Sequence, residues 1–193
     1  MKFKRKYELI VIGTSNGGVT ALIELLKGLS PKFNIPIVIV IHLGKNSLNQ
    51  LCSVLQHHTK LKVKEPDEKE VIRSRCIYLA SPGYHLLIEP DRSFSYCASE
   101  PVNFSRPSID VLFESAADAF TSKLVGVILT GANTDGTKGL FRIKHKGGLL
   151  MVQDPNTAQS SEMPASAIRA CDPDFTGSIK EITIKMNSLL FEN

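Results

Sequence analysis

Short runs of apolar, mostly β-branched residues recur along the chain without the alternation expected of a half-exposed strand. Such runs predict strands that are buried on both faces, as in a parallel sheet. They cover residues 7–12, 37–41, 124–129 and 149–153. Other segments have apolar residues at helical spacing, over residues 19–29, 47–56, 109–121, 137–146, 164–170 and 179–191. Strands that alternate with helices predict an α/β fold, a single doubly wound and mainly parallel sheet flanked by helices, with ligands at the carboxyl ends of the strands.

The segment between residues 60 and 97 has a different pattern. Residues 60–70 are charged and contain Pro66, which predicts a short edge strand and a loop. Three further runs, at residues 75–80, 85–89 and 93–97, are separated by Ser-Pro-Gly and Pro-Asp-Arg turns. Short strands joined by tight turns predict a short antiparallel excursion in the middle of the chain. No repeat or low-complexity tract interrupts the pattern, so residues 1–193 are expected to form a single domain.

The first predicted strand leads into the sequence Gly13-Thr14-Ser15-Asn16-Gly17-Gly18. Its glycines allow the backbone to turn sharply, and the helix that follows has free N–H groups that favour negative charge. A serine at this position is well placed for a nucleophilic attack that creates an oxyanion. The same turn is also typical of phosphate-binding loops and of purely structural turns. Because it lacks G-x-G-x-x-G and a Walker lysine, nucleotide binding is the weaker alternative.

Three buried strands lead into a polar residue of catalytic type, namely Ser15, His42 and Asp135. The carboxyl ends of parallel strands share one edge of the sheet, so these side chains can meet there, and they are the set that acyl transfer requires. We expect the His42 ring to lie within hydrogen-bond reach of both other side chains, allowing for looser distances without substrate. Each residue also has a structural interpretation: a turn serine, a histidine bonded to backbone, and an aspartate that caps the helix beginning near Thr137. Because each sits at a strand end, none is expected to contribute to the core.

The remaining histidines compete poorly for a role in this site. His85 follows a Pro-Gly turn and is expected near the site, although a structural role is favoured for it. His57, His58 and His145 lie in polar surroundings and are expected to be solvated. No H-x-x-x-H, H-x-H or C-x-x-C spacing occurs and the four cysteines are widely spaced, so we expect no metal and no cofactor.

Composition narrows the class of protein further. Hydrophobic residues make up 42% and charged residues 22% of the chain, as in an ordinary globular protein. No apolar run approaches the ~20 residues of a membrane span, and the short run after the basic residues 2–6 is not a signal peptide, so we expect a cytoplasmic protein without membrane insertion. The net charge of +4 comes largely from those basic residues. It is compatible with an acidic partner, but a solvated tail is the simpler interpretation and no nucleic-acid partner is expected.

The site segments resemble the catalytic domain of the CheB-type protein-glutamate methylesterases of bacterial chemotaxis. The similarity is carried by Gly13-Thr14-Ser15-Asn16-Gly17-Gly18, Ile41-His42-Leu43 and Leu129-Thr130-Gly131-Ala132-Asn133-Thr134-Asp135-Gly136. Segments at residues 77–86, 106–113, 153–154 and 163–164 also match, in family order. The resemblance implies a hydrolase that removes methyl groups from γ-glutamyl methyl esters of chemoreceptors, with glutamine deamidation as a further activity.

The resemblance also implies a role for each site residue. Ser15 would be the nucleophile, His42 the general base and acid, and Asp135 the residue that orients His42. The expected oxyanion donors are the backbone N–H of Asn16 and one from the loop that contains Ala132. Because the methyl ester lies on a methylated chemoreceptor helix, the site is expected to be a shallow cleft. Its expected walls are residues 103–108, 132–134 and 156–163.

Two departures from the family pattern qualify these expectations. Ala132 and Asn133 stand where the family has the methionine and second glycine of G-M-G-x-D-G. This difference changes the wall of the site, so the alternative is a non-catalytic or differently specific binding module on the same scaffold. Full-length members carry an N-terminal receiver domain, whereas this chain begins directly at the first strand. We therefore expect no receiver domain within it, and a separate receiver domain is a candidate partner.

Overall fold

The computed structural model describes residues 6–42 and 48–191. Its centre is a seven-stranded sheet with the strand order β3-β4-β2-β1-β7-β8-β9, in which every pair of neighbours is parallel. The strands are β1 (Leu9–Thr14), β2 (Ile37–Ile41), β3 (Lys62–Lys64), β4 (Cys76–Leu79), β7 (Leu124–Ile128), β8 (Leu149–Gln153) and β9 (Phe175–Gly177). The doubly wound, mainly parallel α/β fold predicted from the sequence is confirmed.

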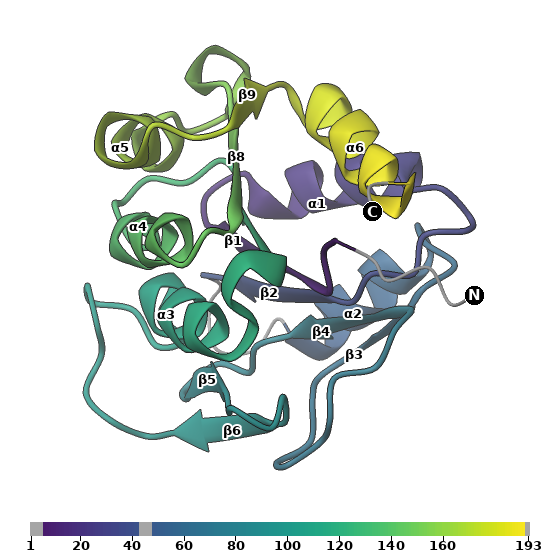
Figure 1. Ribbon diagram of the computed structural model, residues 1–193, viewed down its shortest axis with the longest axis vertical. Coiled ribbons are helices and arrows are strands. Elements are labelled where there is room, and N and C mark those ends of the chain that lie inside the picture. The colour runs from purple at the N-terminus through teal and green to yellow at the C-terminus, as the bar shows by residue number, and fades with distance from the viewer. Residues whose placement is uncertain (1–5, 43–47, 192–193) are drawn as a thin grey trace.

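Helices cover both faces of this sheet (Figure 1). One layer contains α3 (Ile109–Phe120), α4 (Thr137–His145) and α5 (Glu162–Cys171). The opposite layer contains α1 (Gly18–Gly28), α2 (Leu48–Gln56) and α6 (Ile179–Ser188). Short 3-10 turns occur at Thr121–Lys123, Pro155–Thr157 and Leu189–Phe191. The predicted start of α2 at residue 47, the residues 43–44 after His42 and the basic residues 2–5 lie outside the described residues.

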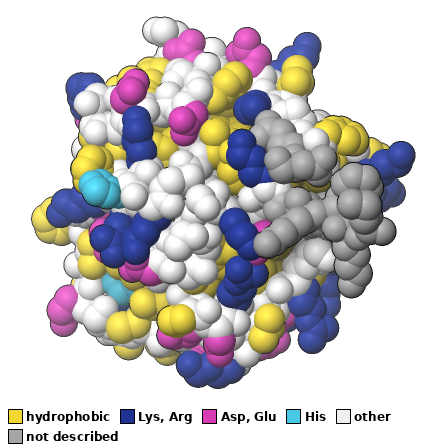
Figure 2. All heavy atoms as spheres, in the orientation of Figure 1, with side chains coloured by type: hydrophobic (Ala, Val, Ile, Leu, Met, Phe, Trp, Pro, Cys, Tyr) yellow, Lys and Arg dark blue, Asp and Glu magenta, His cyan; other side chains and the backbone are white. Residues whose placement is uncertain are grey.

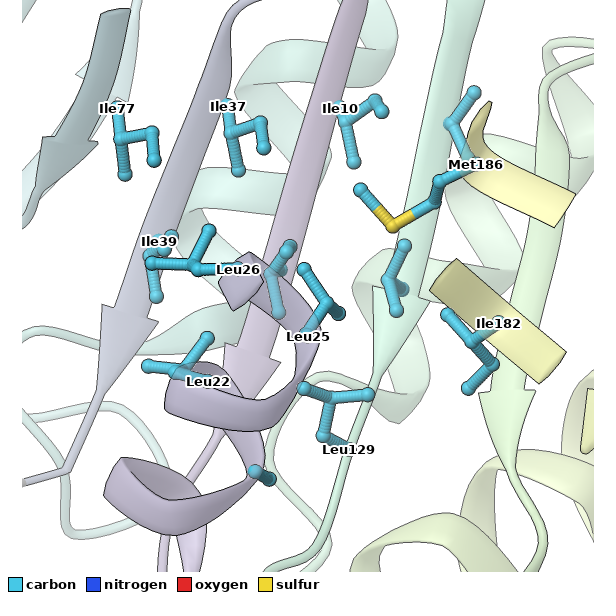
Figure 3. Close-up of a cluster of buried hydrophobic side chains, with 14 of the residues drawn as sticks. Ile10, Leu22, Leu25, Leu26, Ile37, Ile39, Ile77, Leu129, Ile182 and Met186 are labelled. Carbon is cyan, nitrogen blue, oxygen red and sulfur yellow. The ribbon is translucent and has the colours of Figure 1, made fainter. Parts of the chain in front are cut away.

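The central strands contribute to two separate cores because successive side chains point to opposite faces of a sheet. In β1, Ile10 and Ile12 belong to the core under α1 and α6, whereas Leu9 and Val11 belong to the core under α3 and α4. Figure 3 shows the first core, with leucines of α1 and Met186 of α6 packed over the isoleucines of the central strands. Burying each such side chain stabilises the fold by about 1.5–3 kcal/mol, which explains why these strands are apolar on both faces.

The middle of the chain differs in part from the prediction. β5 (His85–Ile88) and β6 (Phe94–Cys97) form the expected antiparallel pair, as a separate two-stranded sheet packed on α3. The preceding strand β4 was expected to belong to this excursion, and that expectation is wrong. It lies parallel to β2 and β3 in the main sheet. Sequence proximity to the hairpin misled the prediction, whereas the buried Ile77, Tyr78 and Leu79 fit a strand with helices on both sides.

β9 was not predicted at all. Its three residues have no apolar run, and it forms because its backbone pairs with β8 at the sheet edge. β3 occupies the other edge, as expected from its charge and the proline after it. Residue pattern alone identifies buried strands better than edge strands, because edge strands depend on a neighbour for their hydrogen bonds.

The strand order explains where a site can form. From β1 the chain passes through β2 to the edge strand β3, returns to β4, and later crosses to β7 on the other side of β1. The connections after the neighbouring strands β1 and β7 leave in opposite directions, one to β2 and the other to β8, and such a reversal opens a crevice at the carboxyl ends of the two strands. The segments after β1, β2 and β7 meet there, and they carry Ser15, His42 and Asp135.

The surface adds two findings. On the face in Figure 2, Lys and Arg side chains are interspersed with Asp and Glu, so this face does not have one dominant sign of charge. None of the helices over residues 6–42 and 48–191 combines the length and apolar character needed to cross a bilayer.

Candidate functional site

Ser15 follows β1 directly and stands before the N-terminus of α1. Its backbone N–H donates to the Thr130 carbonyl at 3.0 Å, and its side chain is partly exposed. Gly17 is the N-cap of α1 with φ of 80°, a left-handed conformation that favours glycine, and no side chain caps this helix. The first turn of α1 also lacks acidic residues, so its positive dipole end is not neutralised from within the helix.

His42 follows β2, and its ring reaches across β1 toward the segment after β7. Its Nε2 lies 3.0 Å from Oδ2 of Asp135, and 14% of the side chain is exposed. A contact between residues 93 positions apart at the same sheet edge is what the parallel topology predicts.

Asp135 is fully buried and is the acceptor at the centre of a hydrogen-bond network. Within the described residues, three side chains and three backbone N–H groups donate to it at 2.7 to 3.2 Å. They are the side chains of His42, Ser108 and Asn103 and the N–H groups of Ile109, Asp110 and Gly136. Burial alone would raise the pKa of Asp135, but the hydrogen bonds from His42 and the other donors outweigh it and hold the pKa below its usual value. The carboxylate is therefore ionised and fixed in place.

This network corrects two expectations. Asp135 was considered as a cap for the helix near Thr137, yet α4 has Gly136 as its N-cap and no side-chain cap. Asp135 binds the N-terminus of α3 instead, and the side chain of Ser108 donates to Asp135 rather than capping its own helix. The expectation that no site residue contributes to the interior is also wrong for Asp135, since it joins α3 to the loop after β7.

Asp135 and Asn133 agree on which nitrogen of His42 carries the proton. Its Oδ1 accepts from the backbone N–H of Asp135 at 3.1 Å, so its Nδ2 faces Nδ1 of His42 at 3.3 Å. An amide nitrogen only donates, so Nδ1 accepts and the ring proton lies on Nε2, which donates to Asp135. The ring nitrogen left to receive a proton is therefore Nδ1.

The contact between Ser15 and His42 is not formed in this structure. Within the described residues, the His42 ring is bonded to Asp135 and Asn133, and no hydrogen bond joins it to the Ser15 side chain. The expected reach to Asp135 is thus met, whereas the expected reach to Ser15, which allowed for looser distances without substrate, stays a prediction. Catalytic hydrogen bonds are often long without substrate and tighten when it binds.

The two predicted oxyanion donors lie on exposed segments. Asn16 is exposed, and its side-chain Nδ2 donates to Ser160 at 2.6 Å. Ala132 is exposed as well, while the neighbouring N–H of Gly131 is already bonded to the Ser160 carbonyl at 3.0 Å. Gly131 is thereby excluded as a donor, which leaves residues 132–134 of the predicted loop.

Two residues outside the predicted triad support the site. His85 is buried, and its Nδ1 accepts from the N–H of Ser108 while its Nε2 bonds the Glu100 carbonyl, so it fixes the segment that holds Asp135. Asn103 bridges two carboxylates, donating to Asp135 and to Asp110 at 3.1 and 2.8 Å. The sequence predicted a structural role near the site for His85. It gave no signal for this role of Asn103, whose partners depend on a turn that no pattern of polar residues identifies. Within the described residues, no group of His, Cys, Asp and Glu side chains is arranged to hold a metal ion.

Fold and site together define an α/β protein with the residue types of acyl transfer at the carboxyl edge of its sheet. A family model described as CheB methylesterase matches residues 10–186, and the chain belongs to this family. A relative from Leptospira interrogans is 52% identical over 91% of this chain and 91% of its own length. A Thermotoga maritima relative named protein-glutamate methylesterase/protein-glutamine glutaminase is 32% identical over 95% of this chain, which spans 54% of that relative. The crystal structure of the T. maritima CheB methylesterase catalytic domain, also 32% identical, matches with a TM-score of 0.90 over 95% of this chain and 98% of that one.

Proposed function

We propose that this protein is a protein-glutamate methylesterase that hydrolyses γ-glutamyl methyl esters with Ser15, His42 and Asp135. Family membership supports the reaction, and the names of the relatives add glutamine deamidation to it. The single observation that carries the residue roles is the 3.0 Å contact between His42 Nε2 and the buried, ionised Asp135. That contact leaves Nδ1 of His42 as the base for Ser15.

In the first half of the reaction, Nδ1 of His42 takes the proton from Ser15 Oγ as Oγ attacks the ester carbonyl carbon. The carbonyl π electrons move to oxygen, and the oxyanion is stabilised by the N–H of Asn16 and by a second N–H, assigned to Ala132. The intermediate collapses as the bond to the methoxy group breaks. His42 returns its proton to the leaving oxygen, so methanol departs and an acyl-enzyme remains.

In the second half, water replaces methanol. His42 takes a proton from the water as its oxygen attacks the acyl carbon, and the proton then passes back to Ser15 Oγ as the acyl bond breaks. The products are glutamate and free enzyme. A glutamine side chain enters the same cycle with ammonia as the leaving group.

The substrate is a methylated helix of a chemoreceptor, and all of residues 1–193 serve as one catalytic domain. Because the target is a side chain on another protein, the exposed segments around Ser15 suit it better than an enclosed cavity. A cytoplasmic location and a separate receiver domain as partner stay predictions from the sequence.

Incubation with a methylated receptor fragment tests this function. Methanol release by the wild-type protein and its loss in Ser15→Ala support it, and ammonia release from an unmethylated fragment measures the deamidase activity. No methanol release by a correctly folded wild-type protein contradicts the proposal and favours a binding module on this scaffold.

A further inference from the structure

A tight turn beside the site holds a phenylalanine in an unusual conformation. Val102 and Ser105 exchange two backbone hydrogen bonds, at 3.1 and 2.9 Å. The two residues between them, Asn103 and Phe104, have φ of 51° and 60°. Two left-handed residues inside such a turn are typical of a type I′ turn, where asparagine followed by glycine is preferred. A phenylalanine in the second position is strained, because its Cβ is too close to the backbone.

The side chain of Phe104 gains nothing from the rest of the described chain in return for this strain. Its relative exposure is 105%, compared with 53% for Phe141 and 81% for Phe191. Isolated apolar side chains on a surface are common and need no explanation by themselves. Full exposure together with a conformation that disfavours the residue means that Phe104 stabilises neither the turn nor the fold.

The turn is fixed to the catalytic network. Asn103, the residue before Phe104, donates to the carboxylates of Asp135 and Asp110. Arg106, just after the turn, donates to the carbonyls of Ala98 and Ser99 at 3.0 and 2.8 Å. In Figure 1 the connection from β6 to α3, which carries this turn, stands out at the edge of the molecule. Phe104 is therefore displayed on a rigid support, one residue away from a donor to Asp135.

We propose that Phe104 is a docking contact for the receptor helix that carries the methyl ester, an inference that rests on the proposed function. Because Asn103 bonds Asp135, the turn lies beside the site, and a helix that presents its modified side chain to Ser15 would pass next to it. Phe104 would pack on an apolar side chain of that helix next to the modified residue. An aromatic ring held rigidly in place loses little entropy on binding, and such residues are enriched in the cores of protein interfaces. The contact gives affinity for a helical protein substrate, whereas a small ester does not extend to it.

The test compares two substrates with the same variants. Phe104→Gly and Phe104→Asn keep the turn, because both residues tolerate positive φ. For each variant, kcat/KM is measured with a methylated receptor fragment and with a small activated ester. We expect the ratio of the two values to fall about tenfold or more, through KM for the receptor fragment, and the melting temperature to stay level or rise as strain is removed. The matched control is Phe191→Ala, an exposed phenylalanine next to α6, which should leave the ratio unchanged.

A ratio that stays within twofold of wild type in both Phe104 variants overturns the inference. An equal fall with both substrates also overturns it, because the ring would then affect the reaction centre rather than docking. A wild-type protein that hydrolyses neither substrate refutes the proposed function and this inference with it. Hydrolysis of both substrates without any effect of Phe104 refutes the inference alone.

Discussion

The two halves of the site are built differently. Asp135 is fully buried and accepts hydrogen bonds from three side chains and three N–H groups, whereas Ser15 is partly exposed and not bonded to the His42 ring within the described residues. In the proposed mechanism, the orienting half is therefore part of the fold, and the nucleophilic half completes its hydrogen bond when substrate binds. A change in the first half should alter stability and activity together, and a change in the second half should alter activity alone.

Ser15→Ala is expected to show the largest difference between its effect on activity and its effect on stability. Removing the nucleophile of a triad costs up to about six orders of magnitude in kcat, because its members act as a unit. The loss of one partly exposed hydroxyl should change the free energy of unfolding by less than ~1 kcal/mol. Methanol release and thermal melts of the same preparation measure both quantities. A large drop in melting temperature would mean that Ser15 also stabilises the fold, which would contradict the distinction between the two halves.

Asp135→Asn should affect both quantities. Comparable triads lose about four orders of magnitude in rate when the orienting carboxylate becomes an amide. The substitution also replaces one carboxylate oxygen with an NH2 group. This group would face the N–H and O–H donors that surround Asp135, so we expect a loss of roughly 3 kcal/mol in the free energy of unfolding. Denaturant titration of the variant beside Ser15→Ala checks this contrast. Equal stability of the two variants is the outcome that this comparison does not allow.

Acid should weaken the orienting half selectively. The pKa of Asp135 is lower in the folded protein than in the unfolded chain, where it is about 3.9. Its ionised form thus stabilises the fold above about pH 4, and this stabilisation is lost as pH falls through the lower folded pKa. Between pH 5 and pH 2.5, stability should fall less steeply in Asp135→Asn than in wild type, as followed by denaturant midpoints. Parallel curves for the two proteins would mean that folding does not lower the pKa of Asp135.

The smallest effect is expected for Asn133, whose side chain is bonded to the His42 nitrogen that would accept the proton of Ser15. Its amide occupies the nitrogen of His42 that Ser15 needs, so this hydrogen bond must break before the proton can move. Asn133→Gly, which introduces the residue of the family pattern, should raise the rate of ester hydrolysis about fivefold, the equivalent of one neutral hydrogen bond of about 1 kcal/mol. A fall in rate would mean that Asn133 supports the active ring orientation instead.

The difference between the halves also explains what the sequence could predict. Ser15 and His42 follow apolar strands closely, so the pattern that identifies the strands also locates these residues. Asp135 was found in the same way, but its surroundings were not, because its donors come from a helix N-terminus and a turn far away in sequence. Asn103 is 32 residues from Asp135, and no periodicity relates two such positions. The start of α3 could not be predicted either. Ser108 donates to Asp135 and does not cap α3 itself, and a serine before a helix is compatible with either role.

The same reasoning applies to the fold. Strands buried on both faces were predicted because their composition alone requires helices above and below. β4 was assigned to the wrong sheet and β9 was missed, because a short strand takes its partner from the tertiary structure. Both errors lie away from the crevice at β1, where the structure brings His42 and Asp135 together as the strand pattern predicts.

The measurement that tests the central claim most directly is the rate of covalent labelling by a fluorophosphonate probe, with the labelled residue identified by peptide mass spectrometry. An active Ser-His-Asp site predicts one equivalent of label on Ser15 in the wild-type protein and a fall of about three orders of magnitude or more in His42→Ala, because the hydroxyl then has no base. Labelling of Ser15 at the same rate in wild type and His42→Ala, or labelling at another residue, would contradict the account.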